Sequence, residues 1–184
     1  MSPRRLAVFA LMFLVLGCGS PLPNRDPTGE RFPSVRGTAL SGDAVALPAD
    51  LAGAPAVLLV GYVQNAQFDL DRWILGLLQA ETPVRLLEVP TIDGLVPGMI
   101  ANSIDSGMRR GIPEEDWGSV VTVYDDAASI VAFTGETRPQ NGRILLLDAD
   151  GVVRWFHDRG YSAGVLLQLD AAVRALGEGV GEEP

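Results

Sequence analysis

Very few side chains in this sequence could act as nucleophiles, bases or metal ligands. The 184 residues include one Cys (Cys18) and one His (His157), and the 14 Lys and Arg positions are all Arg. Schiff-base chemistry and the phosphate-loop lysine are excluded because both need Lys. The 23 acidic residues give a net charge of -9, whereas nucleic-acid binders carry a basic face. One His and one Cys cannot form a zinc site, so no metal and no cofactor is expected.

Ser162 is a second residue that could do chemistry. It is the central residue of Gly160-Tyr161-Ser162-Ala163-Gly164, which has the Gly-x-Ser-x-Gly pattern of a nucleophile elbow. With His157 as its base, Ser162 could serve a small serine hydrolase, and the two side chains would then lie about 3 Å apart. Elbow enzymes have their His after the Ser, however, and here it comes before. The favoured interpretation is that Ser162 caps a helix and His157 ends a strand.

Two charged clusters offer further alternatives. Arg109 and Arg110 could bind an anionic group in a receptor for a small anion, although surface arginines are ordinarily solvated. Glu114, Glu115 and Asp116 could hold calcium, but carboxylates also favour the first turn of a helix. The helix start is the favoured interpretation of this acidic cluster.

The N-terminus has the pattern of an export signal. Arg4 and Arg5 precede an apolar run over 6–16, which is shorter than the roughly 20 residues that span a bilayer. Residues 1–17 are therefore predicted to be a signal peptide. The run ends in Val15-Leu16-Gly17-Cys18, which resembles the lipobox of bacterial lipoproteins. The resemblance implies cleavage before Cys18, a diacylglyceryl group on its thiol, and a fatty acid such as palmitate on the new amine.

Lipidation of Cys18 would determine where the protein lies and would consume its only thiol. Two or three acyl chains hold a protein on a bilayer, where one chain would not. The protein is then expected in the cell envelope, facing the periplasm or the exterior, with the bilayer and possibly an envelope protein as partners. Gly19 rather than Asp follows the Cys, which favours the outer membrane in a cell with two membranes. No thiol would remain for a disulfide.

Hydrophobic patterns divide the rest of the chain. Residues 18–33 are rich in Pro and polar residues and are predicted to form a flexible tether, followed by a domain over 34–177 and a disordered tail over 178–184. The patterns predict, in order, a hairpin (38–47), a central buried strand (56–63), a helix (68–81), a strand (84–89), a helical insertion (91–117), a strand (119–124), a short helix ending at 133, a hairpin (143–156) and a helix from Ser162 stopped by Gly177.

Two local features within this pattern are further predictions. Met99, Ile100, Ile104 and Met108 lie on one face of the insertion helix and are expected to be core residues. Asp125 or Asp126 is expected to cap the short helix that follows the third strand.

The order of these elements resembles the thioredoxin-like fold in its peroxiredoxin and periplasmic-reductase forms. Three stretches carry the resemblance: 57–62, 121–126 and 144–155, the last an apolar strand, Asp148-Ala149-Asp150-Gly151 and a second strand. The resemblance implies an α/β fold, a three-layer sandwich with a mixed sheet, an N-terminal hairpin and a helical insertion. The segment Met108 to Pro113 more weakly resembles bacterial relatives of the mitochondrial ATP synthase assembly factor family.

The sequence departs from this family at the redox site. The Cys-x-x-Cys position falls at Gln67-Phe68-Asp69-Leu70, which has no sulfur. Disulfide exchange and peroxide reduction both need a thiolate. The resemblance places the family's cis-proline at the position of Gly142. Pro139 lies three positions earlier, and the sequence does not determine whether the peptide bond before it is cis or trans. The favoured function is therefore a binding or assembly factor that is not an enzyme.

The resemblance also implies where a partner would bind. In relatives, extended partners lie beside the redox loop and the cis-proline segment, and backbone pairing there needs no catalyst. The candidate partner surface consists of Gln64, Asn65, Gln67, Phe68, Asp69, Asn141, Gly142 and Arg143.

Overall fold

The structure, a computed structural model, describes residues 21–94 and 98–179. The predicted signal peptide (1–17) and Cys18 lie outside these residues. The domain begins with a hairpin in which β1 (Val35–Ala39) pairs antiparallel with β2 (Ala44–Leu47), as predicted. Within the described ranges, no helix is long and apolar enough to cross a bilayer.

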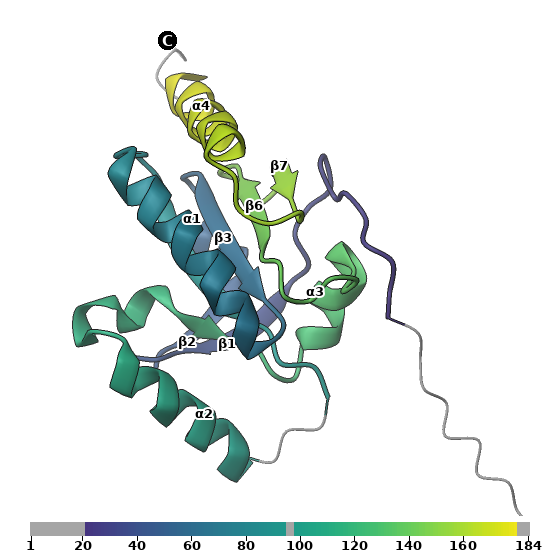
Figure 1. Ribbon diagram of the computed structural model, residues 1–184, viewed down its shortest axis with the longest axis vertical. Helices are drawn as coiled ribbons and strands as arrows, with labels where there is room; N and C mark the ends of the chain where they lie inside the picture. The colour runs from purple at the N-terminus through teal and green to yellow at the C-terminus, as the bar shows by residue number, and fades with distance from the viewer. Residues whose placement is uncertain (1–20, 95–97, 180–184) are drawn as a thin grey trace, which may run out of the picture.

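A strand-helix-strand unit forms the centre of the molecule (Figure 1). Strand β3 (Ala56–Gly61) leads into α1 (Gln67–Gln79), and β4 (Arg85–Pro90) returns parallel to β3. On the other side of β3 lie the antiparallel strand β6 (Arg143–Leu147) and then β7 (Val153–His157). The sheet order is β4-β3-β6-β7. The continuous apolar run of β3 is explained by its central position, where both faces are buried.

The remaining elements flank this sheet. A second sheet has the order β2-β1-β5, and isolated parallel bridges connect the β5 segment to the β4 segment. The bounds of the other elements are η1 (Ala49–Leu51), η2 (Gln64–Ala66), α2 (Gly98–Gly111), η3 (Glu114–Ser119), β5 (Val121–Thr122), α3 (Ala127–Thr134) and α4 (Ala163–Gly179).

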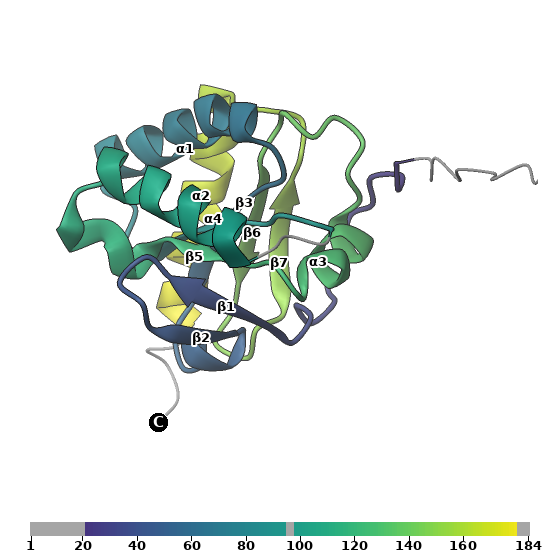
Figure 2. The same cartoon turned by 90° about the horizontal axis from the view of Figure 1, so that it is seen from below.

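Helices cover both faces of the central sheet, which gives three layers (Figures 1 and 2). Helices α1 and α4 cover one face, where Val57 and Leu59 of β3 pack with Trp73. Helix α3 and the N-terminal hairpin cover the other face, where Leu58 and Val60 join a second cluster. Alternate residues of β3 therefore supply both clusters. The α/β three-layer sandwich with a mixed sheet, predicted from the sequence, is confirmed.

Helix α2 differs from the prediction for its apolar face. The stripe formed by Met99, Ile100, Ile104 and Met108 was expected in the core, but α2 has no buried residue. The side chain of Met99 is 86% exposed and that of Ile100 is 52% exposed. The core prediction is wrong because α2 lies outside the two layers that cover the sheet. Met99 and Ile100 are exposed, and Ile104 and Met108 are only half-buried.

Two predicted helix boundaries also need correction. Asp126 precedes α3 at its N-cap position, but its carboxylate accepts a hydrogen bond from the backbone N–H of Arg36 at 2.7 Å instead of capping the helix. Helix α4 passes through Gly177 and continues to Gly179. A glycine costs only about 1 kcal/mol in a helix, so it need not end one.

The segment predicted to be a flexible tether is ordered from Leu22 onward. The N–H of Gly29 donates to the carbonyl of Val153 at 2.8 Å, and the N–H of Val153 donates to Glu30 at 2.9 Å. Phe32 is 1% exposed and belongs to the core. The prediction is wrong for residues 22–33 because the edge of β7 supplies the hydrogen-bond partners that a Pro-rich segment cannot find within itself.

Gly135 provides a test of this docking. It ends α3 with φ of 74°, and a Cβ at this position would lie 2.2 Å from the carbonyl oxygen of Pro23 and 2.5 Å from Cα of Asn24. Gly135→Ala should therefore release the N-terminal segment and lower the free energy of unfolding by about 1 to 3 kcal/mol. Limited proteolysis should cut the variant near Asn24 faster than the native protein. Unchanged proteolysis and stability would contradict the docked arrangement.

Candidate functional site

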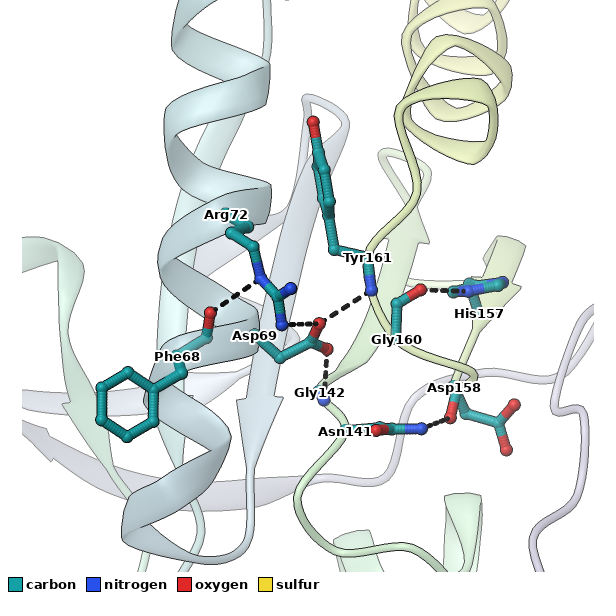
Figure 3. Close-up of polar contacts among 9 residues, drawn as sticks. All are labelled: Phe68, Asp69, Arg72, Asn141, Gly142, His157, Asp158, Gly160 and Tyr161. Carbon is teal, nitrogen blue, oxygen red and sulfur yellow. Dashed lines mark hydrogen bonds and ion pairs between the residues drawn. The ribbon is translucent and has the colours of Figure 1, made fainter.

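A hollow of about 370 Å³ lies beside the first turn of α1. The loop before β6 and the loop before α4 form its other walls (Figure 3). Its lining residues are Asn65, Phe68, Asp69, Arg72, Gln140, Asn141, Gly160 and Tyr161. We refer to it as the Asp69 hollow. Its polar side chains could bind a ligand by hydrogen bonding.

Asp69 joins the three walls of the hollow. Its side chain is buried, at 4% exposure. One carboxylate oxygen, Oδ2, accepts a hydrogen bond from the N–H of Gly142 at 3.0 Å, and the other, Oδ1, accepts from the N–H of Tyr161 at 2.7 Å (Figure 3). These contacts link α1 to segments 73 and 92 residues away. Both oxygens of this carboxyl group are thus occupied by backbone donors.

Arg72 and Phe68 form the outer rim on α1. The Nε of Arg72 donates to the carbonyl of Phe68 at 3.0 Å, and an Nη lies 3.4 Å from Oδ1 of Asp69. Arg72 is largely exposed, so this ion pair adds little to stability. The ring of Phe68 points away from Asp69 and is 71% exposed (Figure 3). The rim therefore offers a cation and an aromatic ring to an incoming ligand.

An aromatic cluster lies next to the hollow. The ring of Trp73 is fully buried, and its centroid lies 5.5 Å from Tyr161, 5.6 Å from His157 and 6.2 Å from Trp155. The Trp73–Tyr161 and Trp73–Trp155 contacts are edge-to-face, an arrangement that favours aromatic pairs. The cluster ties α1 to β7 and to the loop before α4, so the wall containing Tyr161 is held firmly.

Arg143 is fully buried and organises the loop before β6. Its guanidinium donates to the carbonyls of Gly135, Thr137, Arg138 and Asn141 and to Oδ1 of Asn24, at 2.7 to 3.2 Å. It also lies 5.1 Å from the ring centroid of Tyr62. Burial lowers the pKa of this guanidinium and raises the pKa of Tyr62 to about 12. Among the residues that the structure describes, no carboxylate forms an ion pair with Arg143.

The eight residues predicted as a partner surface divide by burial. Gln64, Asn65, Gln67 and Phe68 are exposed, and Asn141 is half-buried. Asp69, Gly142 and Arg143 are buried, so their place on a contact surface is wrong. The structure adds Arg72, Gln140 and Tyr161 to the site. Helical spacing could have indicated Arg72, which lies one turn after Phe68, and Gln140 is next to Asn141 in the sequence. Tyr161 reaches the hollow only through long-range folding.

The peptide bond before Pro139 is trans, because the single cis bond among the described residues is Leu47–Pro48. The segment that precedes β6 is held by the side chain of Arg143 and by the Asp69–Gly142 hydrogen bond.

The proposed pairing of Ser162 with His157 is not found. The Nε2 of His157 lies 2.9 Å from the carbonyl oxygen of Gly160, and no hydrogen bond joins it to Ser162 in the part of the chain that the structure describes. Ser162 precedes α4, and its carbonyl accepts the N–H of Leu166 at 2.9 Å. No described hydrogen bond involves its hydroxyl, so side-chain capping is not found either. The hydrolase hypothesis is wrong because the imidazole faces a backbone carbonyl.

The other charged clusters remain apart from the hollow. Arg109 donates to the carbonyl of Leu40 at 2.7 Å and lies 5.7 Å from the Trp117 ring, while Arg110 is exposed. The acidic cluster Glu114, Glu115 and Asp116 starts η3, as expected for a helix start. Over residues 21–94 and 98–179, no three His, Cys, Asp or Glu side chains come together as a metal site.

Glu88 predicts a pH dependence of stability. It is 8% exposed on β4, and burial raises the pKa of its carboxyl group above 4.5. A hydrogen bond with Gln67 offsets part of this increase in pKa, and the charge of Asp71 adds to it. Because the folded protein favours the protonated carboxyl group, the stabilisation that Glu88 contributes is complete below pH 4.5 and is lost as the pH rises through the folded pKa. Glu88→Gln should therefore be more stable than the native protein at pH 7, with the difference shrinking toward pH 4. Urea denaturation at several pH values checks this, and a pH-independent difference would contradict it.

The fold of this chain is thioredoxin-like. No family model matches the chain, and no curated protein matches its sequence. Similar solved structures include BsSco, a member of the Sco family of cytochrome c oxidase assembly proteins (TM-score 0.56, 11% identity, 83% of this chain and 98% of that chain). Another is a thiol:disulfide interchange protein of the thioredoxin family from Chlorobium tepidum (TM-score 0.51, 13% identity, 84% of this chain and 99% of that chain). A third is a thiol peroxidase from Chromobacterium violaceum (TM-score 0.52, 12% identity, 81% of this chain and 88% of that chain).

Proposed function

We propose that this chain is a lipid-anchored binding or assembly factor of the bacterial cell envelope, with a thioredoxin-like domain that carries no redox chemistry. One observation carries the proposal: Gln67 and Leu70 stand at the two positions where the resemblance places thiols, and the carboxyl group of Asp69 between them accepts two backbone hydrogen bonds. None of these side chains supplies the thiolate that disulfide exchange requires. The sole Cys lies at position 18, at the end of the lipobox-like sequence.

The ligand class follows from the rim of the Asp69 hollow. Asn65, Gln140 and Asn141 present amide groups, which pair with the N–H and C=O groups of an extended polypeptide. Phe68 offers an exposed ring to an apolar side chain of that polypeptide. The ligand is therefore a segment of an envelope protein, bound without catalysis.

Three measurements test this proposal on the native, membrane-extracted protein. Intact-mass analysis should find Cys18 at the N-terminus, carrying acyl chains. Disulfide-exchange and peroxide-reduction assays should give no turnover above the buffer rate. An unmodified thiol at Cys18 contradicts the anchor, and turnover without a thiol contradicts the loss of redox chemistry.

The binding surface is tested by site-specific photocrosslinking in the native cells. A photoreactive residue in place of Asn65, at the rim of the hollow, should capture one defined envelope protein. The same residue in place of Leu167, which is 61% exposed on α4, is the matched control. Capture of the same set of proteins at both positions would contradict a binding site at the hollow.

A further inference from the structure

Half of the exposed large apolar side chains lie at one end of the molecule. Eight such residues are exposed among those described. Four of them belong to segments that follow the carboxyl ends of β3 and β4: Val63, Phe68, Met99 and Ile100. The others are Leu22 in the N-terminal segment, and Leu75, Leu78 and Leu167 further along α1 and α4. We call the first end the anchor end.

The first turn of α2 projects furthest at the anchor end. In Figure 1 it lies at the lower end of the long axis, with the first turn of α1 above it, whereas α4 extends toward the opposite end. Met99 and Ile100 belong to this first turn, and Met99 is the most exposed large apolar side chain described. A projecting apolar turn of this kind is suited to insertion into the boundary between headgroups and acyl chains.

The docked N-terminal segment limits the length of chain between the domain and Cys18. The carbonyl of Leu22 accepts the N–H of Glu136 at 3.0 Å and the hydroxyl of Thr137 at 3.1 Å, so the chain is held to the domain up to this residue. Cys18 is four residues earlier in the sequence. Four residues span at most about 14 Å, which is less than the full thickness of a bilayer. A lipid on Cys18 would therefore hold the domain against the membrane surface.

Charged groups next to the departing segment suit a zwitterionic headgroup. A second hollow, of about 400 Å³, is lined by both arginines and aspartates. They are Arg25, Arg138, Arg159, Asp26 and Asp158. Arginine binds phosphate oxygens well, while the carboxylates match the headgroup amine. The net charge of -9 disfavours an anionic membrane.

We propose that the anchor end of the domain lies on the bilayer, with Met99 and Ile100 inserted at the headgroup boundary. The proposal rests on the lipid anchor at Cys18 in the proposed function. It fixes the orientation of the domain and presents the Asp69 hollow close to the membrane surface. A ligand segment of an integral membrane protein could then reach it without leaving the bilayer.

Site-specific fluorescence tests the docking. A single new cysteine can be labelled because acylation blocks Cys18. The environment-sensitive dye NBD is placed at Met99→Cys or Ile100→Cys, and at Leu78→Cys and Leu167→Cys as controls of similar exposure. The acylated full chain is reconstituted in phosphatidylcholine vesicles that contain a lipid with a nitroxide near its headgroup. Quenching at positions 99 and 100 should exceed quenching at the controls by about threefold or more.

The outcomes separate the two proposals. Vesicle flotation and intact mass report on the lipid anchor alone. If the protein floats but all four positions are quenched equally, or positions 99 and 100 are not quenched, the docking is wrong and the anchor stands. If the protein does not float, the anchor in the proposed function is wrong, and the docking loses its basis with it.

Discussion

Replacing Arg143 by Met should lower the free energy of unfolding by about 3 to 5 kcal/mol, as expected when several buried oxygen acceptors lose their hydrogen-bond donors together. The Met side chain fills most of the same volume but donates no hydrogen bond. The carbonyls of Gly135, Thr137, Arg138 and Asn141 and the amide oxygen of Asn24 would all lose a donor. Urea denaturation followed by circular dichroism measures the effect.

Two further variants separate the role of the guanidinium from that of its charge. Arg143→Lys keeps the charge but cannot direct five donors in a planar fork, so its stability should lie between those of the Met variant and the native protein. Arg110→Met is the matched control, because Arg110 is exposed, and it should change stability by less than about 0.5 kcal/mol. An Arg143→Met variant as stable as the control would show that water replaces the guanidinium without loss.

Replacing Asp69 by Ala should cost about 3 kcal/mol, because the N–H groups of Gly142 and Tyr161 would be left buried without an acceptor. Asp69→Asn retains one acceptor oxygen and should cost about half as much. Hydrogen exchange of the Gly142 and Tyr161 amides should become at least about tenfold faster in the Ala variant, since their opening no longer breaks a charge-assisted bond.

The control for Asp69 lies two residues along the same helix. Asp71 is exposed and accepts a hydrogen bond from Gln67, so Asp71→Ala removes the same charge without unpairing buried donors. Its effect on stability should stay below about 0.5 kcal/mol. Equal losses in the two variants would mean that Asp69 acts only as a helix charge. Binding to the captured partner should weaken in Asp69→Ala, because the walls of the hollow separate.

Asp69 and Arg143 hold the loops around the Asp69 hollow. The carboxyl group of Asp69 accepts two backbone hydrogen bonds, which connect α1 with the loops before β6 and α4. The two Nη groups of Arg143 donate to four backbone carbonyls, while its Nε has no partner within the described residues. We therefore expect the walls of the hollow to be rigid.

The sequence predicted the elements well, because each has a local signature. The apolar run at Ala56 indicated a central buried strand, and the helical spacing of Leu70, Trp73 and Leu77 indicated the helix that follows it. The turn at Asp148 was also correct, since its carboxylate accepts the N–H groups of Asp150 and Val152 at 2.9 Å. These signals depend on neighbours a few residues apart.

The candidate site was predicted only in outline. Its position after the central strand followed from the resemblance, and the exposed members Gln64, Asn65, Gln67 and Phe68 lie there. The burial of Asp69 could not be predicted, because its two donors are 73 and 92 residues away. Only a fold that closes those distances can tell a surface carboxylate from a buried one.

The amino-acid sequence by itself determined the order of strands and helices and the absence of any thiol after Cys18, since both can be read from the local sequence. Tertiary structure alone decided that Arg143 is buried, that residues 22–33 are held to the domain and that the first turn of α2 is exposed. The physical reason is that hydrophobic periodicity specifies which face of an element avoids water, whereas pairing between distant polar groups depends on where the whole chain places them.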